Sequence, residues 1–255
     1  MSATPGQTIK VNGIEMYFET RGEGEPLVLL HGGGGIGANW RLIFGETPAG
    51  FQLIVPDMRG HGRSTNPSGE FTFRQCALDL FALLDHLGVG QFKAVGMSLG
   101  AKTLLHMATE QPARAEAVVL VSAAPYFPAE TRALIREFSA AEHTEAEWRQ
   151  MREWHRHGDE QIRALWRLGD AIKDNYTDMN FTPPLLSTIN ARTLIVHGDR
   201  DPLYPVRLAT EMYAAIPRSY LWVIPNGGHG PVFGALAERF VETSLAFLRG
   251  EWECE

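Results

Sequence analysis

The chain has 255 residues, of which 44% are hydrophobic and 21% are charged, and its formal net charge is −7. A chain of this length and apolar content can bury a core without a disulfide or a metal to hold it. Its 23 basic residues are scattered, which argues against a surface for nucleic acid or an anionic membrane. We expect one domain with an insertion and no polyanionic partner.

The cysteines and the N-terminus indicate the compartment. Cys76 and Cys254 are the two cysteines, and they give neither a disulfide framework nor a metal-ligand spacing. The N-terminus lacks a basic region followed by an apolar run, and no stretch approaches the ~20 apolar residues of a membrane span. These features predict a soluble cytoplasmic protein.

The N-terminal part predicts a hairpin followed by two buried strands. Asn12-Gly13 is a strong tight-turn signal between strand-like residues 8–11 and 14–20. Continuous apolar runs at 27–30 and 51–55 are typical of strands covered on both faces of a parallel sheet, with a short helix expected over 39–44.

Two glycine-rich loops follow these strands. His31 precedes four glycines, and a backbone with almost no side chains can come close to a substrate and point its N–H groups freely, as an oxyanion hole requires. The loop over 56–64 fits neither phosphate-binding glycine pattern. We interpret it as structural, with Asp57 and Arg59 held in local hydrogen bonds.

The rest of the chain alternates helices and strands, with one interruption. A helix over 73–87 ending at Gly88, strands at 92–97 and 117–121 and a helix from 99 predict a parallel sheet with right-handed crossovers. The rhythm resumes with strands at 193–197 and 220–224, helices at 205–215 and 236–248, and a loop at 225–231.

Between residues 125 and 190 the sequence predicts only helices, at 130–141, 144–155 and 160–173. A helical insertion over the edge of the sheet would place a hydrophobic ceiling above the loops at that edge. Many of the large aromatic side chains of the chain lie in this segment: Phe138, Trp148, Trp154, Trp166, Tyr176 and Phe181.

The stretch Gly96-Met97-Ser98-Leu99-Gly100 joins a predicted strand to a predicted helix and fits G-x-S-x-G, the nucleophile elbow. In this turn the serine backbone is strained, and side chains two positions either side would collide. Glycine at 96 and 100 removes both collisions. A serine hydroxyl is a poor nucleophile at neutral pH, so it needs a base to take its proton. The base in turn needs a partner that fixes its tautomer.

The chain supplies these groups at strand ends, in the order Ser98, an aspartate and then His229. Parallel strands bring such loops to one carboxyl edge of the sheet. With this order, the chain resembles the α/β-hydrolase superfamily, and in particular its members with a helical cap, over nearly its whole length. The resemblance rests on five motifs: Leu29-Leu30-His31-Gly32-Gly33, Asp57-Met58-Arg59-Gly60-His61-Gly62-Arg63-Ser64, Gly96-Met97-Ser98-Leu99-Gly100, His197-Gly198-Asp199-Arg200-Asp201 and Gly228-His229.

The resemblance implies a role for each site residue. Ser98 would be the nucleophile and His229 the general base and acid. The acid of this family lies three residues after the glycine that ends its strand, which selects Asp201 over the runner-up Asp199.

The oxyanion donors would be the backbone N–H groups of Gly33 and Leu99. Gly34 replaces Gly33 if the glycine run is shifted. The resemblance also implies three segments: a core over 1–124 and 191–255, and a helical cap over 125–190.

The remaining histidines predict no metal site. His31 and His61 belong to fold motifs and are expected to hold loops. His155 and His157 are alternate residues that would not share a helix face, and no further ligands converge on them in sequence. We expect neither a metal nor an organic cofactor.

The predicted function is that of a serine hydrolase, a carboxylesterase cleaving small apolar esters through an acyl-enzyme. A carbon–carbon bond hydrolase is the nearest alternative, because the run after His31 resembles the start seen in hydrolases of ring-cleavage products, although Gly35-Ile36-Gly37 departs from it. A cofactor-free haloperoxidase or perhydrolase, and a ligand receptor with slow turnover, stay open. Epoxide hydrolases and haloalkane dehalogenases need a carboxylate where Ser98 stands. The expected partner is a small-molecule ester, and a homo-oligomer is compatible with the sequence.

Overall fold

A computed structural model describes residues 6–252, so Cys254 lies outside the described residues. One sheet of eight strands forms its centre, in the order β1-β2-β4-β3-β5-β6-β7-β8. Strands β3 to β8 pair in parallel, whereas β2 runs antiparallel to both β1 and β4. The strands are β1 Gln7–Val11, β2 Ile14–Arg21, β3 Glu25–Leu30, β4 Phe51–Pro56, β5 Phe92–Met97, β6 Ala115–Val121, β7 Arg192–Gly198 and β8 Ser219–Ile224.

The predicted hairpin is confirmed. Asn12 and Gly13 have φ values of 42° and 80°, the left-handed pair that a type I′ turn requires, and β1 pairs with β2 on either side of them. This hairpin gives the otherwise parallel sheet its antiparallel edge.

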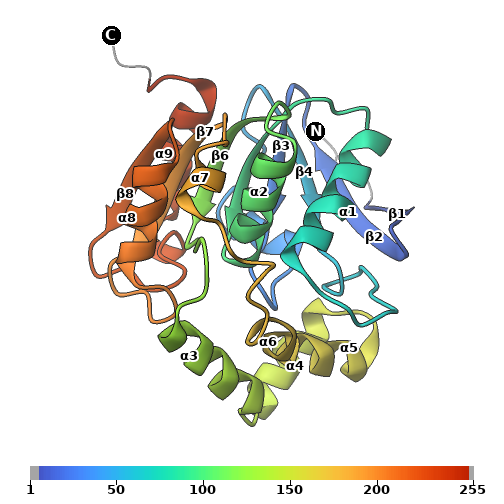
Figure 1. The fold of residues 1–255 in the computed structure, drawn as a ribbon. Helices are drawn as coiled ribbons and strands as arrows, with labels where there is room; N and C mark the ends of the chain where they lie inside the picture. Colours follow the sequence, from blue (N-terminus) through green and yellow to red (C-terminus); the bar gives the residue numbers. More distant parts are fainter. Residues whose placement is uncertain (1–5, 253–255) are drawn as a thin grey trace.

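Helices cover both faces of the sheet, as the apolar runs predict (Figure 1). Helices α1 Phe73–His86, α2 Leu99–Glu110 and α8 Val206–Ala215 contribute to one apolar cluster, and η1 Gly37–Leu42 and α9 Ala237–Arg249 contribute to the other. Strand β3 serves both clusters, because Val28 and Leu30 point to the first and Leu27 and Leu29 to the second. This alternation explains why the strand reads as one unbroken apolar run.

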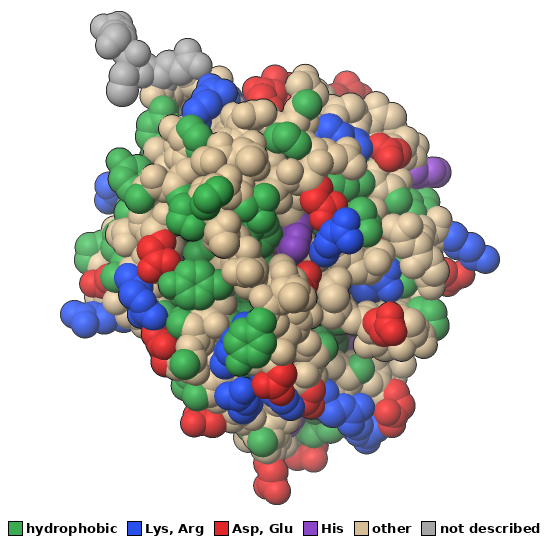
Figure 2. Space-filling model, in the orientation of Figure 1, with side chains coloured by type: hydrophobic (Ala, Val, Ile, Leu, Met, Phe, Trp, Pro, Cys, Tyr) green, Lys and Arg blue, Asp and Glu red, His purple; other side chains and the backbone are tan. Residues whose placement is uncertain are grey.

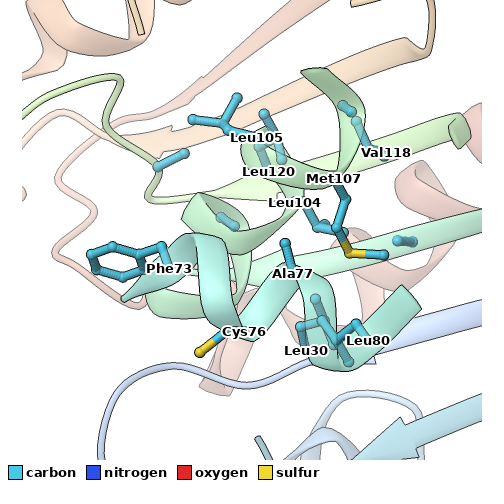
Figure 3. Packing of buried hydrophobic residues seen from close by; sticks show 14 of the residues in the cluster. Leu30, Phe73, Cys76, Ala77, Leu80, Leu104, Leu105, Met107, Val118 and Leu120 are labelled. Carbon is cyan, nitrogen blue, oxygen red and sulfur yellow. The ribbon is translucent and has the colours of Figure 1, made fainter. Parts of the chain in front are cut away.

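Helices α1 and α2 pack against each other over the first cluster (Figure 3). Figure 3 shows Ala77 and Leu80 of α1 beside Leu104 and Met107 of α2, with Leu30 of β3 beneath them. All five side chains are buried. This packing fixes α2, and with it the turn that precedes α2, against the sheet.

Residues 125–190 form helices and one isolated bridge between Tyr126 and Asn180, in agreement with the predicted helical segment. Figure 1 shows α3 to α6 beyond one end of the sheet. The helices are α3 Ala129–Ala140, α4 Glu145–Trp154, α5 Gly158–Trp166, α6 Leu168–Ile172 and α7 Pro183–Leu186.

The single helix predicted over 160–173 is wrong, because the chain breaks at Arg167 into α5 and α6. A Cβ on Gly169 would lie 2.2 Å from Oγ of Ser139 and 2.9 Å from Cγ2 of Ile135, so α6 lies directly against α3. The break redirects the chain to make this contact, which the local sequence pattern does not report.

Lys and Arg side chains are interspersed with Asp and Glu on the face shown in Figure 2, most densely over the part occupied by α3 to α6. Over residues 6–252, no helix combines the length and the apolar character that crossing a membrane requires.

Candidate active site

Ser98 sits on an abrupt turn between β5 and α2. Its φ of 48° and ψ of −103° lie in a strained region for a residue with a side chain. A Cβ on Gly96 would lie 2.7 Å from the carbonyl carbon of Gly100, and a Cβ on Gly100 would lie 2.4 Å from the carbonyl oxygen of Leu30. Both glycines are therefore required for the turn, as the motif predicts.

The structure brings Ser98, His229 and Asp201 together. Nε2 of His229 lies 2.9 Å from Oγ of Ser98, and Nδ1 of His229 lies 2.8 Å from Oδ2 of Asp201. The Asp201 side chain is fully buried, whereas that of His229 is 21% exposed. A carboxylate that fixes an imidazole, which in turn faces a hydroxyl, can draw the proton from that hydroxyl as it attacks a carbonyl.

Two contacts hold the loops that carry His229 and Asp201. A Cβ on Gly198 would lie 2.2 Å from the carbonyl oxygen of Gly227, so the ends of β7 and β8 come unusually close. The hydroxyl of Ser122, at the end of β6, donates to the carbonyl oxygen of His229 at 2.6 Å. The histidine is thus fixed through its backbone as well as through its ring.

Hydrogen bonds keep the Asp201 carboxylate charged. Burial by itself raises the pKa of Asp201, but the hydrogen bond from His229 and the backbone N–H groups of Tyr204 and Leu203 outweigh burial and hold that pKa below its ordinary value. Asp199, the alternative acid, is not at the site: its carboxylate lies 3.9 Å from the exposed Arg200 guanidinium.

The Gly32–Gly35 loop passes beside Ser98. A Cβ on Gly32 would lie 3.7 Å from Cβ of Ser98, and one on Gly33 would lie 3.7 Å from Cδ1 of Leu99. The N–H of Gly34 donates to Nε2 of His61 at 3.2 Å, so it is already engaged. Within the described chain, the N–H groups of Gly33 and Leu99 donate to no hydrogen-bond acceptor. The geometry therefore favours Gly33 over Gly34 as the partner of Leu99.

His31 orients the Gly33 N–H. Nδ1 of His31 lies 2.8 Å from the carbonyl oxygen of Gly32, and Nε2 accepts from the N–H of Met58 at 3.0 Å. Every described peptide bond is trans, so the Gly33 N–H points away from the Gly32 carbonyl of the same peptide group. His31 is thus one of the groups that fix this carbonyl and, with it, the direction of the Gly33 N–H.

A cavity of about 620 Å³ opens between this loop and the helices of residues 125–190. Trp154 and Trp166 line it, as the predicted hydrophobic ceiling requires, while Trp148 packs its ring against Trp166 instead. Phe138 and Leu42 are largely exposed and give the cavity an apolar rim. The other apolar lining side chains are Trp40, Met97, Met151, Leu165 and Phe233.

The glycine-rich loop over 56–64 is structural, as predicted. Asp57 accepts hydrogen bonds from the N–H groups of Gly37 and Arg63. Arg59 pairs with the buried Asp79 at 2.8 Å, a partner 20 residues away and not a local one. The sequence motif identified the loop but not this partner.

The other histidines make structural contacts. The helix expected over 144–155 is observed as α4, with Thr144 and His155 as its N-cap and C-cap residues. His157 lies beyond its end. Across residues 6–252, no group of three or more His, Cys, Asp and Glu side chains is arranged to hold a metal ion.

Sequence reasoning missed Lys102 and Tyr204. Nζ of Lys102 is buried, donates to the Tyr204 hydroxyl at 2.6 Å and lies over the rings of Phe73, Phe127 and Tyr204. Burial lowers the pKa of Lys102 to about 7. The Tyr204 ring packs edge-on against that of His229, with centroids 5.2 Å apart. A lysine in the first turn of the helix after the elbow was the available signal.

Comparison with known proteins gives the family. A sequence profile described as α/β hydrolase fold matches residues 25–156, just over half of the chain. The chain belongs to this family of hydrolases.

Individual relatives differ in their reactions. The chain is similar to a pimeloyl-[acyl-carrier protein] methyl ester esterase from Nitrosomonas europaea, with 27% identity covering 89% of this chain and 96% of that protein. It is also 28% identical to a 2-hydroxymuconate semialdehyde hydrolase from Pseudomonas sp. (strain CF600), covering 88% and 87%. Among solved structures, a thermophilic esterase from Thermogutta terrifontis matches with a TM-score of 0.74 and 25% identity, covering 98% and 99%.

Proposed function

We propose that this hydrolase is a serine carboxylesterase that cleaves small, largely apolar esters. The observation that carries the proposal is the continuous hydrogen-bonded series from Ser98 through His229 to Asp201. A largely apolar cavity adjoins it, with a lining that includes Met97 and Gly32, neighbours of Ser98 in sequence and in space respectively. The similarity to two esterases supports it.

The reaction proceeds in two halves. Oγ of Ser98 attacks the ester carbonyl while His229 takes its proton, and the N–H groups of Gly33 and Leu99 stabilise the oxyanion. His229 then gives the proton to the departing alcohol. Asp201 stays charged and stabilises the imidazolium of His229. In the second half His229 activates water, which attacks the acyl-enzyme and releases the acid.

The cavity lining supports an apolar acyl group. A volume of about 620 Å³ accepts a substrate of drug-like size, and aromatic and aliphatic side chains dominate its walls. We propose that residues 125–190 act as a cap over a core formed by 1–124 and 191–255, and that this cap sets the acyl preference.

Steady-state hydrolysis of p-nitrophenyl esters from acetate to decanoate tests the function. We expect turnover that peaks at one chain length and falls at least 10³-fold in Ser98→Ala, since removing a triad member leaves only oxyanion-hole and binding effects. Turnover that persists in Ser98→Ala, or none in the folded wild type, contradicts the proposal.

A carbon–carbon bond hydrolase is the second candidate. The four glycines after His31 and the similarity to a 2-hydroxymuconate semialdehyde hydrolase favour it. A vinylogous diketone substrate separates the two: loss of its absorbance at a higher kcat/KM than any ester would replace the esterase proposal.

Haloperoxidase or perhydrolase activity and slow-turnover ligand binding also fit a Ser-His-Asp arrangement. Perhydrolysis is measured by adding hydrogen peroxide to the ester assay, and receptor behaviour by saturable binding without multiple turnover. We further propose a cytoplasmic location and a small-molecule ester as partner.

A further inference from the structure

The peptide groups of the Gly32–Gly35 loop form a relay that ends at the Gly33 N–H. The N–H of Gly35 donates to the carbonyl oxygen of Gly32 at 3.1 Å, which closes a tight turn. Gly34 occupies the third position of this turn with a φ of 71°, where a side chain would be strained. The Gly32 carbonyl and the Gly33 N–H belong to the peptide group that joins residues 32 and 33. The Gly34 carbonyl and the Gly35 N–H belong to the peptide group that joins residues 34 and 35.

His155 binds the far end of this relay. It follows the last residue of α4, and its Nε2 lies 3.1 Å from the carbonyl oxygen of Gly34. Its Nδ1 accepts from the N–H of Gly62 at 2.8 Å. The imidazole is 2% exposed, although it comes from the helical segment and not from the sheet.

These contacts fix the proton on the ring. Because the Gly62 N–H is a donor, Nδ1 of His155 must be unprotonated, so Nε2 carries the proton and donates to the Gly34 carbonyl. Burial supports the neutral form, since it lowers the pKa of His155 to about 4. The ring therefore acts as a bridge with one acceptor and one donor at neutral pH.

The His155 bridge determines the directions of the Gly35 N–H, the Gly32 carbonyl and the Gly33 N–H. When the Gly34 carbonyl points to His155, the Gly35 N–H of the same peptide points the opposite way, to the Gly32 carbonyl. The Gly32 carbonyl is thereby held from two sides, by Gly35 and by His31. Hydrogen bonding at a carbonyl also polarises the N–H of its own peptide, which strengthens the Gly33 donor.

We propose that His155 is a positioning residue for the oxyanion hole, through which the helices over the cavity control the direction of the Gly33 N–H. The inference rests on the proposed function of Gly33. Met151 and Trp154 belong to α4, which ends just before His155, and both line the cavity. A substrate that packs against them therefore contacts the helix that positions His155. His155 acts on the transition state, in which the oxyanion forms, and contributes little to substrate binding.

Two substitutions separate the halves of the bridge. In His155→Asn the amide oxygen replaces Nδ1 and accepts from Gly62, but the side chain is too short to reach Gly34. In His155→Gln the longer amide reaches the position of Nε2 and donates to Gly34. We expect kcat for the best p-nitrophenyl ester to fall about tenfold in the Asn variant with KM within about twofold, and to recover to within about threefold of wild type in the Gln variant. Complete loss of one oxyanion donor costs on the order of 10²-fold to 10³-fold, so a misdirected donor costs less.

His157→Ala is the matched control. His157 lies two residues further along, is exposed, and its Nε2 contacts the carbonyl oxygen of Arg63 at 2.9 Å. It attaches the same segment to the 56–64 loop of the core and makes no hydrogen bond to the Gly32–Gly35 loop. We expect its kcat to stay within about twofold of wild type. An equal loss in His157→Ala and His155→Asn would mean that only attachment of the segment matters, and would overturn the proposal.

An inhibitor pair measures the oxyanion hole directly. A trifluoromethyl ketone forms a tetrahedral adduct with an oxyanion, whereas the matched alcohol does not. In His155→Asn the ketone should bind about tenfold more weakly with the alcohol unchanged. Equal weakening of both inhibitors, or a Gln variant as slow as the Asn variant, contradicts the inference.

An experiment without turnover keeps the inference separate from the proposed function. If the folded wild type hydrolyses no ester, the proposed function fails, and the relay is judged by nuclear magnetic resonance. The two-bond ¹H–¹⁵N spectrum should show His155 protonated at Nε2, and the Gly33 amide resonance should shift in His155→Asn but not in His157→Ala. A proton on Nδ1, or an unmoved Gly33 resonance, overturns it.

Discussion

The two aspartates after β7 differ in what surrounds them, although the sequence places them two residues apart. The Asp201 side chain is fully buried and receives hydrogen bonds from His229 and from two backbone N–H groups. The Asp199 side chain is partly exposed and meets the Arg200 guanidinium at 3.9 Å. An exposed ion pair of this length contributes little.

Substitution of each aspartate by asparagine tests this difference. In Asp201→Asn the amide no longer stabilises the imidazolium and favours the wrong tautomer, so we expect kcat to fall about 10⁴-fold. In Asp199→Asn kcat should stay within about threefold. Steady-state kinetics on one p-nitrophenyl ester, with circular dichroism to verify folding, provide the measurement. A larger loss at Asp199 would reverse the assignment of the acid.

At the scale of the elements, the contact that matters most for the site is the one between α2 and β3. Gly100 lies against the Leu30 carbonyl so closely that any side chain would enter the backbone of β3. Strain of this kind is relieved only by moving α2 away from the sheet, and α2 carries Leu99 and begins after Ser98.

Gly100→Ala should therefore destabilise the protein by about 3 kcal/mol, at the upper end of the cost of overpacking, and should reduce hydrolase activity in the fraction that folds. Gly90→Ala is the control, because a Cβ there meets nothing within 4 Å. Urea unfolding monitored by tryptophan fluorescence gives both free energies. Equal stability of the two variants would contradict the packing argument.

At the scale of the whole molecule, buried neutral histidines make the fold sensitive to acid. His31, His61 and His155 all lie around the glycine loop and are buried. Burial lowers the pKa of His31 to about 4, with the hydrogen bond to Gly32 opposing this shift, and burial likewise lowers the pKa of His61 and of His155. In the unfolded chain these rings take up protons near their ordinary pKa of 6.5.

Because the folded-state pKa lies below the unfolded-state value, the unfolded state binds more protons between pH 6.5 and 4, and stability falls as the pH falls through this window. His31 alone should lower the free energy of unfolding by about 1.5 kcal/mol between pH 6.5 and 5, and His61 and His155 add in the same direction. Urea titrations at the two pH values measure the loss. A free energy that stays constant, or a slope that His155→Gln leaves unchanged, would contradict this prediction.

Most of the architecture follows from the sequence, because its signals are local. Apolar runs mark the buried strands, Asn12-Gly13 marks the hairpin, and Gly96 and Gly100 mark the turn on which Ser98 sits. The order of the motifs predicts that Ser98, Asp201 and His229 meet at one edge of the sheet. The structure places them within hydrogen-bond distance of one another in series. The break at Arg167 was missed because it depends on the close approach of α6 to α3.

The sequence by itself thus determined the fold and the candidate site residues, since glycine-dependent turns and strand ends are fixed by neighbours along the chain. Tertiary structure alone decided how the site is supported: Ser122 on the His229 backbone, Lys102 beneath Tyr204, and His155 on Gly34. These pairs lie up to 121 residues apart in the chain. Their hydrogen bonds exist only where separate elements meet in a buried environment, and no local pattern records which side chain will arrive there.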